Sequence, residues 1–207
     1  MLHIENYILL PAFQTNTWLI WDDEGTGVLF DPSAPSPQLL DSIRDRNLKI
    51  EYIVITHGHL DHIGGIGFFK KELGSKVAIH ALDAPCLTND KLNLSTFMDA
   101  PVLAPQADLL LEDGTELLTG SIRIKVIHTP GHTRGGICLL VGKFLISGDT
   151  LFEQSIGRTD FPGGSHAQII ASIKTKLFIL PDEVVVYPGH GPKTTIGIEK
   201  MTNPFVY

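Results

Sequence analysis

Short apolar runs of strong β propensity recur along the chain, and turns rich in Gly, Pro, Asn and Asp separate them. This pattern is typical of strands, while a 3.6-residue spacing of apolar positions predicts a few helices. In the first half we expect strands at Ile4–Leu10, Thr17–Trp21, Gly27–Phe30 and Glu51–Ile55, and helices at Pro37–Arg46 and from Asp61 to about Leu73.

The second half repeats this order of elements. It predicts strands at Ile122–Ile127, Gly136–Val141, Lys143–Ser147 and Glu183–Tyr187, and a helix at His166–Phe178. Clustered strands with helices between them indicate an α/β fold in which two sheets pack together and helices cover them. No linker divides the chain, so residues 1–207 are expected to form one domain. Pro85–Pro105 is interpreted as a loop over the site, with its helical or coil state left open.

The composition limits the classes of function. The chain has 207 residues, of which 43% are hydrophobic, and a formal net charge of −7. A nucleic-acid-binding face is usually basic, so we expect no nucleic-acid partner. No apolar run approaches the roughly 18 residues of a membrane-spanning helix, and no secretory leader is evident, so the default prediction is a cytoplasmic protein without a membrane partner. Cys86 and Cys138 form no disulfide framework and are interpreted as packing residues.

The densest cluster of polar side chains is Thr56–His62, THGHLDH, directly after a predicted strand. Four ionisable groups at the end of a buried strand are unfavourable unless each has a partner. In an extended segment the side chains at i and i+2 point the same way, so His57 and His59 can face one metal ion. Asp61 and His62 follow in the first turn of the predicted helix and point into the same space.

Three later loops carry residues of the same kind. His132, Asp149 and His190 each follow an apolar β run and lie beside glycine. Taken alone, each is more often a surface, core or turn residue. Strands that end at one edge of a sandwich would bring these three together with THGHLDH, so the recurrence favours a shared site.

One zinc ion binds about four ligands, and seven candidates are present, so we predict two divalent metal ions. A carboxylate can bridge them, because its two oxygens span ions about 3.5–4 Å apart. We favour His57, His59 and His132 on the first ion, Asp61, His62 and His190 on the second, and Asp149 bridging both. Zinc is expected, and iron or manganese would accept the same ligands. The remaining histidines are interpreted as non-ligands: His3, His80, His128 and His166.

These motifs together resemble the metallo-β-lactamase superfamily. THGHLDH is followed by GHT at Gly131–Thr133, SGDT at Ser147–Thr150 and PGH at Pro188–His190, in the family's order and over nearly the whole chain. The resemblance implies a four-layer αββα sandwich with the metals at one edge. Asp31 resembles the family's early aspartate, which supports the site from behind the ligands; the other reading of Asp31 is a turn residue before proline.

Within the superfamily, the bridging aspartate and the stretch Gly157–Gly164, GRTDFPGG, resemble the short bacterial glyoxalase II-like (hydroxyacylglutathione hydrolase-like) branch. Gly191–Gly197 and Asn203–Phe205 are similar to the same branch. The resemblance implies hydrolysis of a small-molecule thioester such as S-D-lactoylglutathione. Longer glyoxalase II enzymes carry a helical C-terminal extension that helps hold glutathione, and we expect it to be absent because 17 residues follow His190.

Two arginines are candidates for substrate binding. Arg158 stands where, by the resemblance, a basic residue meets the glutathione carboxylate; its alternative reading is a solvated loop arginine. Arg134 is a second candidate anion contact. In the chemistry that the site implies, two metal ions lower the pKa of a shared water, and the resulting bridging hydroxide attacks the thioester carbonyl. Asp61 would orient that hydroxide and move its proton.

Two other functions stay open at the level of sequence. The chain also resembles persulfide dioxygenases, which act on glutathione persulfide with one iron; its ligands here would be His57, His132 and Asp149. Pro162–Gly164 and the PGHGP after Tyr187 favour the hydrolase. A non-enzymatic metal-binding protein is the lesser alternative, and the oligomeric state stays open.

Overall fold

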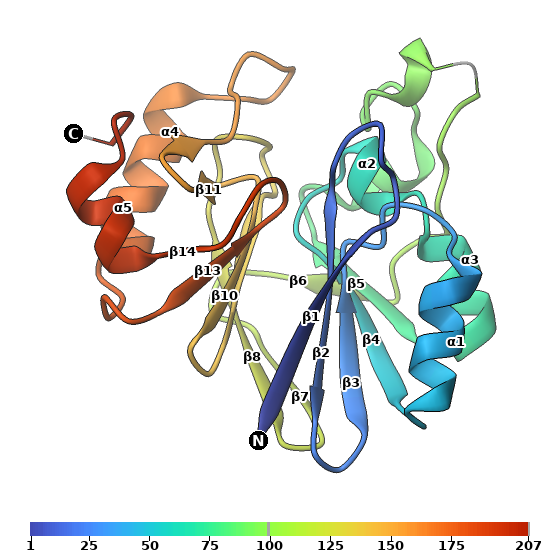
Figure 1. Cartoon of the computed structure of the whole chain (residues 1–207). Coiled ribbons are helices and arrows are strands. Elements are labelled where there is room, and N and C mark those ends of the chain that lie inside the picture. The colour runs from blue at the N-terminus through green and yellow to red at the C-terminus, as the bar shows by residue number, and fades with distance from the viewer. Residues whose placement is uncertain (99, 207) are drawn as a thin grey trace.

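The computed structural model describes residues 1–98 and 100–206, with the backbone alone for Phe97. Two six-stranded sheets lie face to face, and helices cover the outer side of each (Figure 1). The four-layer αββα sandwich expected from the sequence is therefore confirmed. In this part of the chain, no helix is long and apolar enough to cross a membrane.

The first sheet has the order β1-β2-β3-β4-β5-β6. Its strands are β1 (Leu2–Ile8), β2 (Asn16–Asp22), β3 (Thr26–Phe30), β4 (Lys49–Ile55), β5 (Lys76–His80) and β6 (Leu109–Leu111). The first three pair antiparallel, whereas β3 to β6 run parallel to one another. Parallel strands end at the same edge of a sheet, so the loops after β3, β4 and β5 meet there.

The second sheet has the order β14-β13-β10-β9-β8-β7. Its strands are β7 (Glu116–Thr119), β8 (Ile122–His128), β9 (Ile137–Val141), β10 (Phe144–Gly148), β13 (Val185–Pro188) and β14 (Thr194–Thr195). Strands β10 and β13 are parallel neighbours, so the loops that follow them also lie side by side. A two-stranded ribbon, β11 (Leu151–Phe152) with β12 (Ser155–Ile156), extends from the end of β10.

Successive side chains along a strand belong alternately to the core between the two sheets and to a core between a sheet and its helices. In β2, Trp18 and Ile20 belong to the cluster between the sheets, while Leu19 belongs to the cluster under the helices. The strand pleat turns successive side chains to opposite faces, so both faces of each sheet are apolar and both are covered. Val54 belongs to the same inner cluster as Ile124 and Leu139 of the second sheet.

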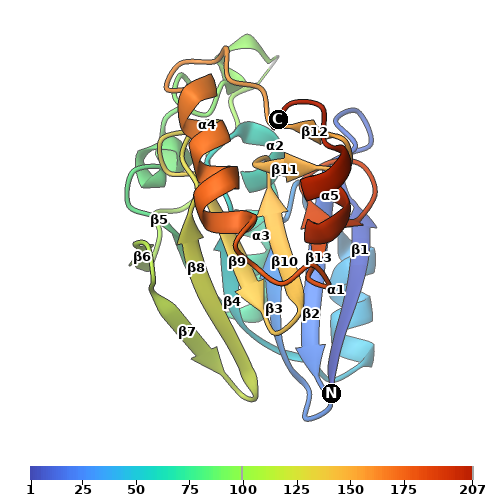
Figure 2. The same ribbon diagram turned by 90° about the vertical axis from the view of Figure 1, so that its left-hand side faces the viewer.

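The helices pack on the outer faces (Figure 2). The first sheet is covered by α1 (Pro37–Asp45), α2 (Leu60–Ile63) and α3 (Ile66–Leu73), and the second by α4 (His166–Ser172), the π-type turn η3 (Ile173–Leu177) and α5 (Ile196–Thr202). Helix α1 begins where the sequence predicts: the Ser36 side chain accepts a hydrogen bond from Leu39 N, and Pro37 follows the cap.

Several predicted boundaries were wrong. The expected helix Asp61–Leu73 is two helices, broken at Gly64 and Gly65. There the loop after β3 passes so close that a Cβ on either glycine would collide with the carbonyl oxygen of Ser33 or Ala34. The expected helix His166–Phe178 ends as an α-helix at Ser172 and continues as η3.

The first strand is Leu2–Ile8 rather than Ile4–Leu10, because Leu10 belongs to the turn that leads into β2. Strands β5, β6, β7, β11, β12 and β14 and helix α5 were not predicted. Pro85–Pro105 contains two short 3₁₀ helices, η1 (Ala84–Thr88) and η2 (Ser95–Phe97). The side chain of Phe97 and all of Asp99 fall outside the described residues.

Asp22 joins the two sheets at the ends of the strands opposite the site. Its Oδ2 accepts hydrogen bonds from the Ser121 backbone N (3.0 Å) and hydroxyl (2.9 Å), in the turn between β7 and β8. Its Oδ1 accepts from the backbone N of Thr26 (2.8 Å) and of Glu24 (3.1 Å). Burial raises the pKa of Asp22, but these bonds outweigh it and leave that pKa below its ordinary value.

We expect Asp22→Ala to lower the free energy of unfolding by about 2 kcal/mol at pH 7, because it removes the charged acceptor of four part-buried hydrogen bonds. The folded-state pKa is depressed, so this contribution is fully present above the unfolded pKa and is lost as the pH falls through the folded value. Urea denaturation followed by tryptophan fluorescence measures the difference. Asp23→Ala is the matched control, since Asp23 is exposed and solvent screens its ion pairs. Equal effects of the two substitutions would contradict the role of Asp22.

Candidate metal centre

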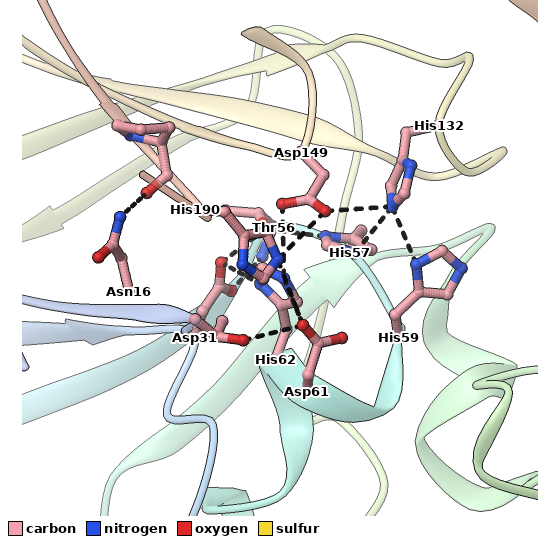
Figure 3. A network of polar contacts seen from close by, with 12 residues as sticks. Asn16, Asp31, Thr56, His57, His59, Asp61, His62, His132, Asp149 and His190 are labelled. Atoms are coloured by element: carbon pink, nitrogen blue, oxygen red, sulfur yellow. Dashed lines mark hydrogen bonds and ion pairs between the residues drawn. The ribbon is translucent and has the colours of Figure 1, made fainter. Parts of the chain in front are cut away.

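The ends of four strands deliver seven predicted ligands to one place between the sheets (Figure 3). THGHLDH follows β4 and passes into α2, while the residues from the second sheet follow β8, β10 and β13. The structure brings together all seven: His57, His59, Asp61, His62, His132, Asp149 and His190. Most are buried, with His190 the most accessible at 29% of its side chain.

Three imidazoles form the first group. His132 Nε2 lies 3.2 Å from His57 Nε2 and 2.9 Å from His59 Nδ1. The other nitrogen of His132, Nδ1, is 2.8 Å from the carbonyl oxygen of Arg158. A carbonyl only accepts, so Nδ1 carries the proton and Nε2 directs a lone pair at the other two rings. Converging lone pairs of this kind fit a bound cation.

The second group contains Asp61, His62 and His190. His62 Nε2 is 3.6 Å from Asp61 Oδ2, and His190 Nε2 is 3.3 Å from the same oxygen. His62 Nδ1 donates to Asp31 Oδ2 at 2.9 Å, which orients the ring so that Nε2 points into the site. Both His62 Nε2 and Asp149 Oδ1 are buried without a hydrogen-bond partner. Buried polar atoms are almost always paired, so these two are suited to a metal ion.

Asp149 lies between the two groups. Its Oδ2 is 3.5 Å from His132 Nε2 on one side and 3.5 Å from His190 Nε2 on the other, and its Oδ1 is 3.5 Å from His62 Nε2. A carboxylate in this position can contact two ions at once. The donor set therefore fits two divalent ions in the division predicted from the sequence.

The pKa values of the histidines shift in opposite directions in the two groups. Burial, followed by the neighbouring histidines, lowers the pKa of His59 to about 3. For His62 burial acts in the same direction, but the carboxylates of Asp61, Asp149 and Asp31 raise its pKa to about 10. Burial also lowers the pKa of His57 well below its ordinary value, so His57 and His59 exclude protons, while the carboxylates around His62 attract positive charge.

Asp31, directly after β3, contacts the site from outside the seven clustered residues, as the family resemblance implied. Its backbone has a φ of +47°, which aspartate tolerates better than most residues. Its Oδ1 accepts from Thr56 N at 2.8 Å, and its Oδ2 accepts from the Thr56 hydroxyl at 2.6 Å as well as from His62. One carboxylate thereby fixes the start of THGHLDH and the ring orientation of His62.

Asp83 is a supporting residue that the sequence did not reveal. It follows β5 and is buried, with 2% of its surface exposed. Its carboxylate accepts from Gly58 N at 3.0 Å, from the Thr133 hydroxyl at 2.7 Å and from Gly135 N at 2.7 Å. These donors lie in the two loops that carry the first histidine group, so Asp83 ties those loops together.

Thr15 and Asn16, at the start of β2, were also missed. The Thr15 hydroxyl donates to Asp61 Oδ2 at 2.8 Å. The Asn16 amide donates to the carbonyl oxygens of Pro188 and Gly191, on either side of His190, at 3.0 and 2.9 Å. No motif surrounds these residues, and a lone polar residue at a strand start carries no sequence signal that distinguishes it.

The two arginines have different surroundings. Arg158 makes a two-pronged ion pair with Asp160, Nε–Oδ1 and Nη2–Oδ2 each being 2.7 Å, and its guanidinium lies 3.8 Å from the centre of the Phe161 ring. It lines the cavity described below. Arg134 is exposed and lies beside Gly163, outside the residues that line the cavity.

The remaining histidines and the cysteines lie outside the cluster. His80 stacks on His128, His3 pairs with Asp23, and His166 is exposed at the start of α4. Burial raises the pKa of Cys86 to about 12 and that of Cys138 to about 11, so both thiols are protonated at neutral pH, as expected for packing residues.

A cavity of about 970 Å³ opens above the cluster. Five of the seven clustered residues form its floor: His59, Asp61, His132, Asp149 and His190. Its walls come from the turn before β2, the segment between η1 and β6, the β11–β12 ribbon and the loop after β12. Pro85–Pro105 thus lies over the site, as the sequence predicted.

A comparison with protein families matches residues 10–190 to the model described as "Metallo-beta-lactamase superfamily". The chain is 35% identical over 210 residues to the hydroxyacylglutathione hydrolase GloC of Haemophilus influenzae, with 96% of each chain covered. It is similar to the crystal structure of the BLEG-1 B3 metallo-beta-lactamase, at 36% identity and a TM-score of 0.94 over 99% of both chains.

Two further solved structures are similar to the chain. One is TTHA1623 in a di-iron-bound form, at 36% identity and a TM-score of 0.86, covering 97% of this chain and 99% of that one. The other is ETHE1 from Myxococcus xanthus, at 30% identity and a TM-score of 0.81, covering 98% of this chain and 83% of that one.

We expect Asp31→Asn to weaken metal binding by about 10–100-fold, because the neutral amide no longer holds the His62 ring with a charged acceptor. Competition against a metal chelator measures the change. Asp41→Asn, on the exposed face of α1, is the control and should bind metal like the wild type. Unchanged affinity in Asp31→Asn would contradict the supporting role.

Asp83→Asn tests the second support. An amide presents an NH₂ group to at least one of the donors that Asp83 accepts from, so a buried N–H loses its partner. We expect a loss of about 1–3 kcal/mol in the free energy of unfolding, together with faster loss of metal from the first histidine group. Urea denaturation and the rate of metal transfer to a chelator give the two readouts. A stable variant with wild-type metal retention would show that Asp83 does not hold these loops.

Proposed function

Because the chain belongs to the metallo-β-lactamase superfamily, we propose that it is a metal-dependent hydrolase that cleaves a thioester such as S-D-lactoylglutathione with two divalent metal ions, zinc being expected. The observation that carries the proposal is the completeness of both donor groups around Asp149. The similarity to GloC, named a hydroxyacylglutathione hydrolase, supports the substrate class. The similarity to TTHA1623 in its di-iron-bound form supports two ions, while leaving iron as an alternative metal.

Metal ions bound here would lower the pKa of a water molecule and polarise the thioester carbonyl. The chain's own residues supply the rest of the chemistry. Thr15 donates to Asp61 Oδ2 and so fixes the carboxylate, which leaves Oδ1 to orient the attacking water and accept its proton. The leaving group is a thiolate, which departs without a strong general acid.

The apolar cavity walls surround the substrate and exclude bulk water, which strengthens the electrostatic interactions at its floor. We propose Arg158 as a contact for a substrate carboxylate, as the resemblance implied. That carboxylate would have to compete with Asp160 for the guanidinium. Arg134 is a weaker candidate, because it lies outside the cavity lining.

An iron-dependent persulfide dioxygenase is the second candidate, since the ETHE1 structure from Myxococcus xanthus is similar over nearly the whole chain. That reaction would use one ion on His57, His132 and Asp149. It gives no ligand role to Asp61, His62 and His190, although they form an equally complete donor group. Because the resemblance to persulfide dioxygenases includes the same seven residues, the preference for the hydrolase rests on Pro162–Gly164, on the PGHGP after Tyr187 and on the similarity to GloC.

The variant His190→Ala distinguishes the hydrolase from the dioxygenase. His190 is the most accessible of the seven residues, so its removal should perturb folding least. For the hydrolase we expect the metal content to fall from about two ions per chain to about one, and kcat/KM for S-D-lactoylglutathione to fall about a hundredfold or more. Elemental analysis of protein purified without chelator and a thioester hydrolysis assay give the two readouts.

His166→Ala is the control, since His166 is exposed and does not belong to the cluster. A wild-type protein with about one iron and no other metal, oxygen uptake with glutathione persulfide, and no loss of iron in His190→Ala would establish the dioxygenase instead. A chromogenic β-lactam belongs in the same panel, because one similar structure is named a metallo-beta-lactamase.

A further inference from the structure

The walls of the cavity differ in character from its floor. The floor is formed by clustered histidines and carboxylates, whereas most of the wall is apolar. Four separate segments contribute Phe13, Leu94, Met98, Phe152, Ile156 and Phe161. Phe13 and Met98 remain 37% and 44% exposed. Apolar side chains that gather, half-exposed, around one cavity are typical of a ligand site rather than of a packed core.

The wall above THGHLDH is held in a fixed shape. Asn93 is fully buried. Its side-chain amide donates to the backbone carbonyl oxygens of Cys86 and Val102, and its backbone carbonyl oxygen accepts from Leu60 N at 2.9 Å. Leu94 follows with a φ of +69°, a conformation that leucine rarely adopts. Strain of this kind persists only where the surrounding contacts impose it, and here it places a leucine in the cavity wall.

Few charged side chains belong to the wall. Arg158 has its guanidinium neutralised by Asp160 and covers the ring of Phe161. Lys91 is the remaining cation among the residues that line the cavity. A lactoyl group is small and carries a hydroxyl, so it would leave most of this apolar surface in contact with water.

We propose that the preferred substrate is a thioester with a bulky apolar group beside the scissile bond, larger than a lactoyl group. The inference rests on the proposed hydrolase function and names its substrate class. The apolar group belongs either to the acyl part or to the thiol. Burying it against the wall provides binding energy remote from the reacting carbonyl, at about 0.8 kcal/mol for each methylene.

Two series of substrates test this. The first keeps glutathione as the thiol and lengthens the acyl group from acetyl to octanoyl, with S-D-lactoylglutathione as the short reference. The second keeps an acetyl group and lengthens a straight-chain alkanethiol. We expect kcat/KM to rise about three- to fourfold per methylene in one of the two series until the cavity is filled. The series that rises identifies the side of the thioester that carries the apolar group.

A matched pair of variants locates the effect. Leu94→Asn removes an apolar wall group, and asparagine tolerates a positive φ, so the fold should be retained. We expect it to lower kcat/KM for the longest substrates by about tenfold and to flatten the dependence on chain length. Leu92→Asn is the control, because Leu92 is 49% exposed in the same segment and does not line the cavity.

Rates that stay flat or fall in both series, while S-D-lactoylglutathione is cleaved, would overturn the inference and leave the hydrolase intact. No cleavage of any thioester by the metal-loaded protein would overturn the proposed function and the inference together. A Leu92→Asn effect equal to that of Leu94→Asn would show that the chain-length dependence does not arise at this wall.

Discussion

Five imidazoles and two carboxylates share one buried edge of the sandwich, and their mutual repulsion is the constraint on which the site depends. His132 Nε2 lies 2.9–3.2 Å from ring nitrogens of His57 and His59, and the carboxylates of Asp61 and Asp149 approach the same nitrogen of His62. In a low dielectric the lone pairs of the three imidazoles repel one another, and so do the two carboxylates. Cations bound between them would offset this repulsion, and a rigid frame behind them holds their positions.

The frame consists of buried polar side chains that connect one strand end to another. Asp31 joins the loop after β3 to the loop after β4, Asp83 joins the loop after β5 to the loop after β8, and Asn16 joins the start of β2 to the loop after β13. Each link is a hydrogen bond to backbone or to a ligand. The ligands are thereby oriented before any ion arrives, which is how the residues around a metal site raise its affinity.

The floor and the walls of the cavity come from different parts of the chain. The clustered residues stand on strand ends and form the cavity floor, whereas the walls come from the turn before β2, the segment between η1 and β6, the β11–β12 ribbon and the loop after β12. Proteins similar to this chain carry names as different as hydroxyacylglutathione hydrolase and metallo-beta-lactamase. A shared floor with different walls accounts for such variety, since function depends on the site rather than on the fold.

The sequence by itself determined the layers and the seven clustered residues, because strand alternation is local and HxHxDH compresses four candidate ligands into one loop. Tertiary structure alone decided the break at Gly64–Gly65, where another loop passes too close for a Cβ, and the roles of Thr15, Asn16 and Asp83. Each of these is an ordinary polar or small residue in its own segment. Its partner lies on a distant strand end, and only the closure of the two sheets brings the pair within hydrogen-bonding distance.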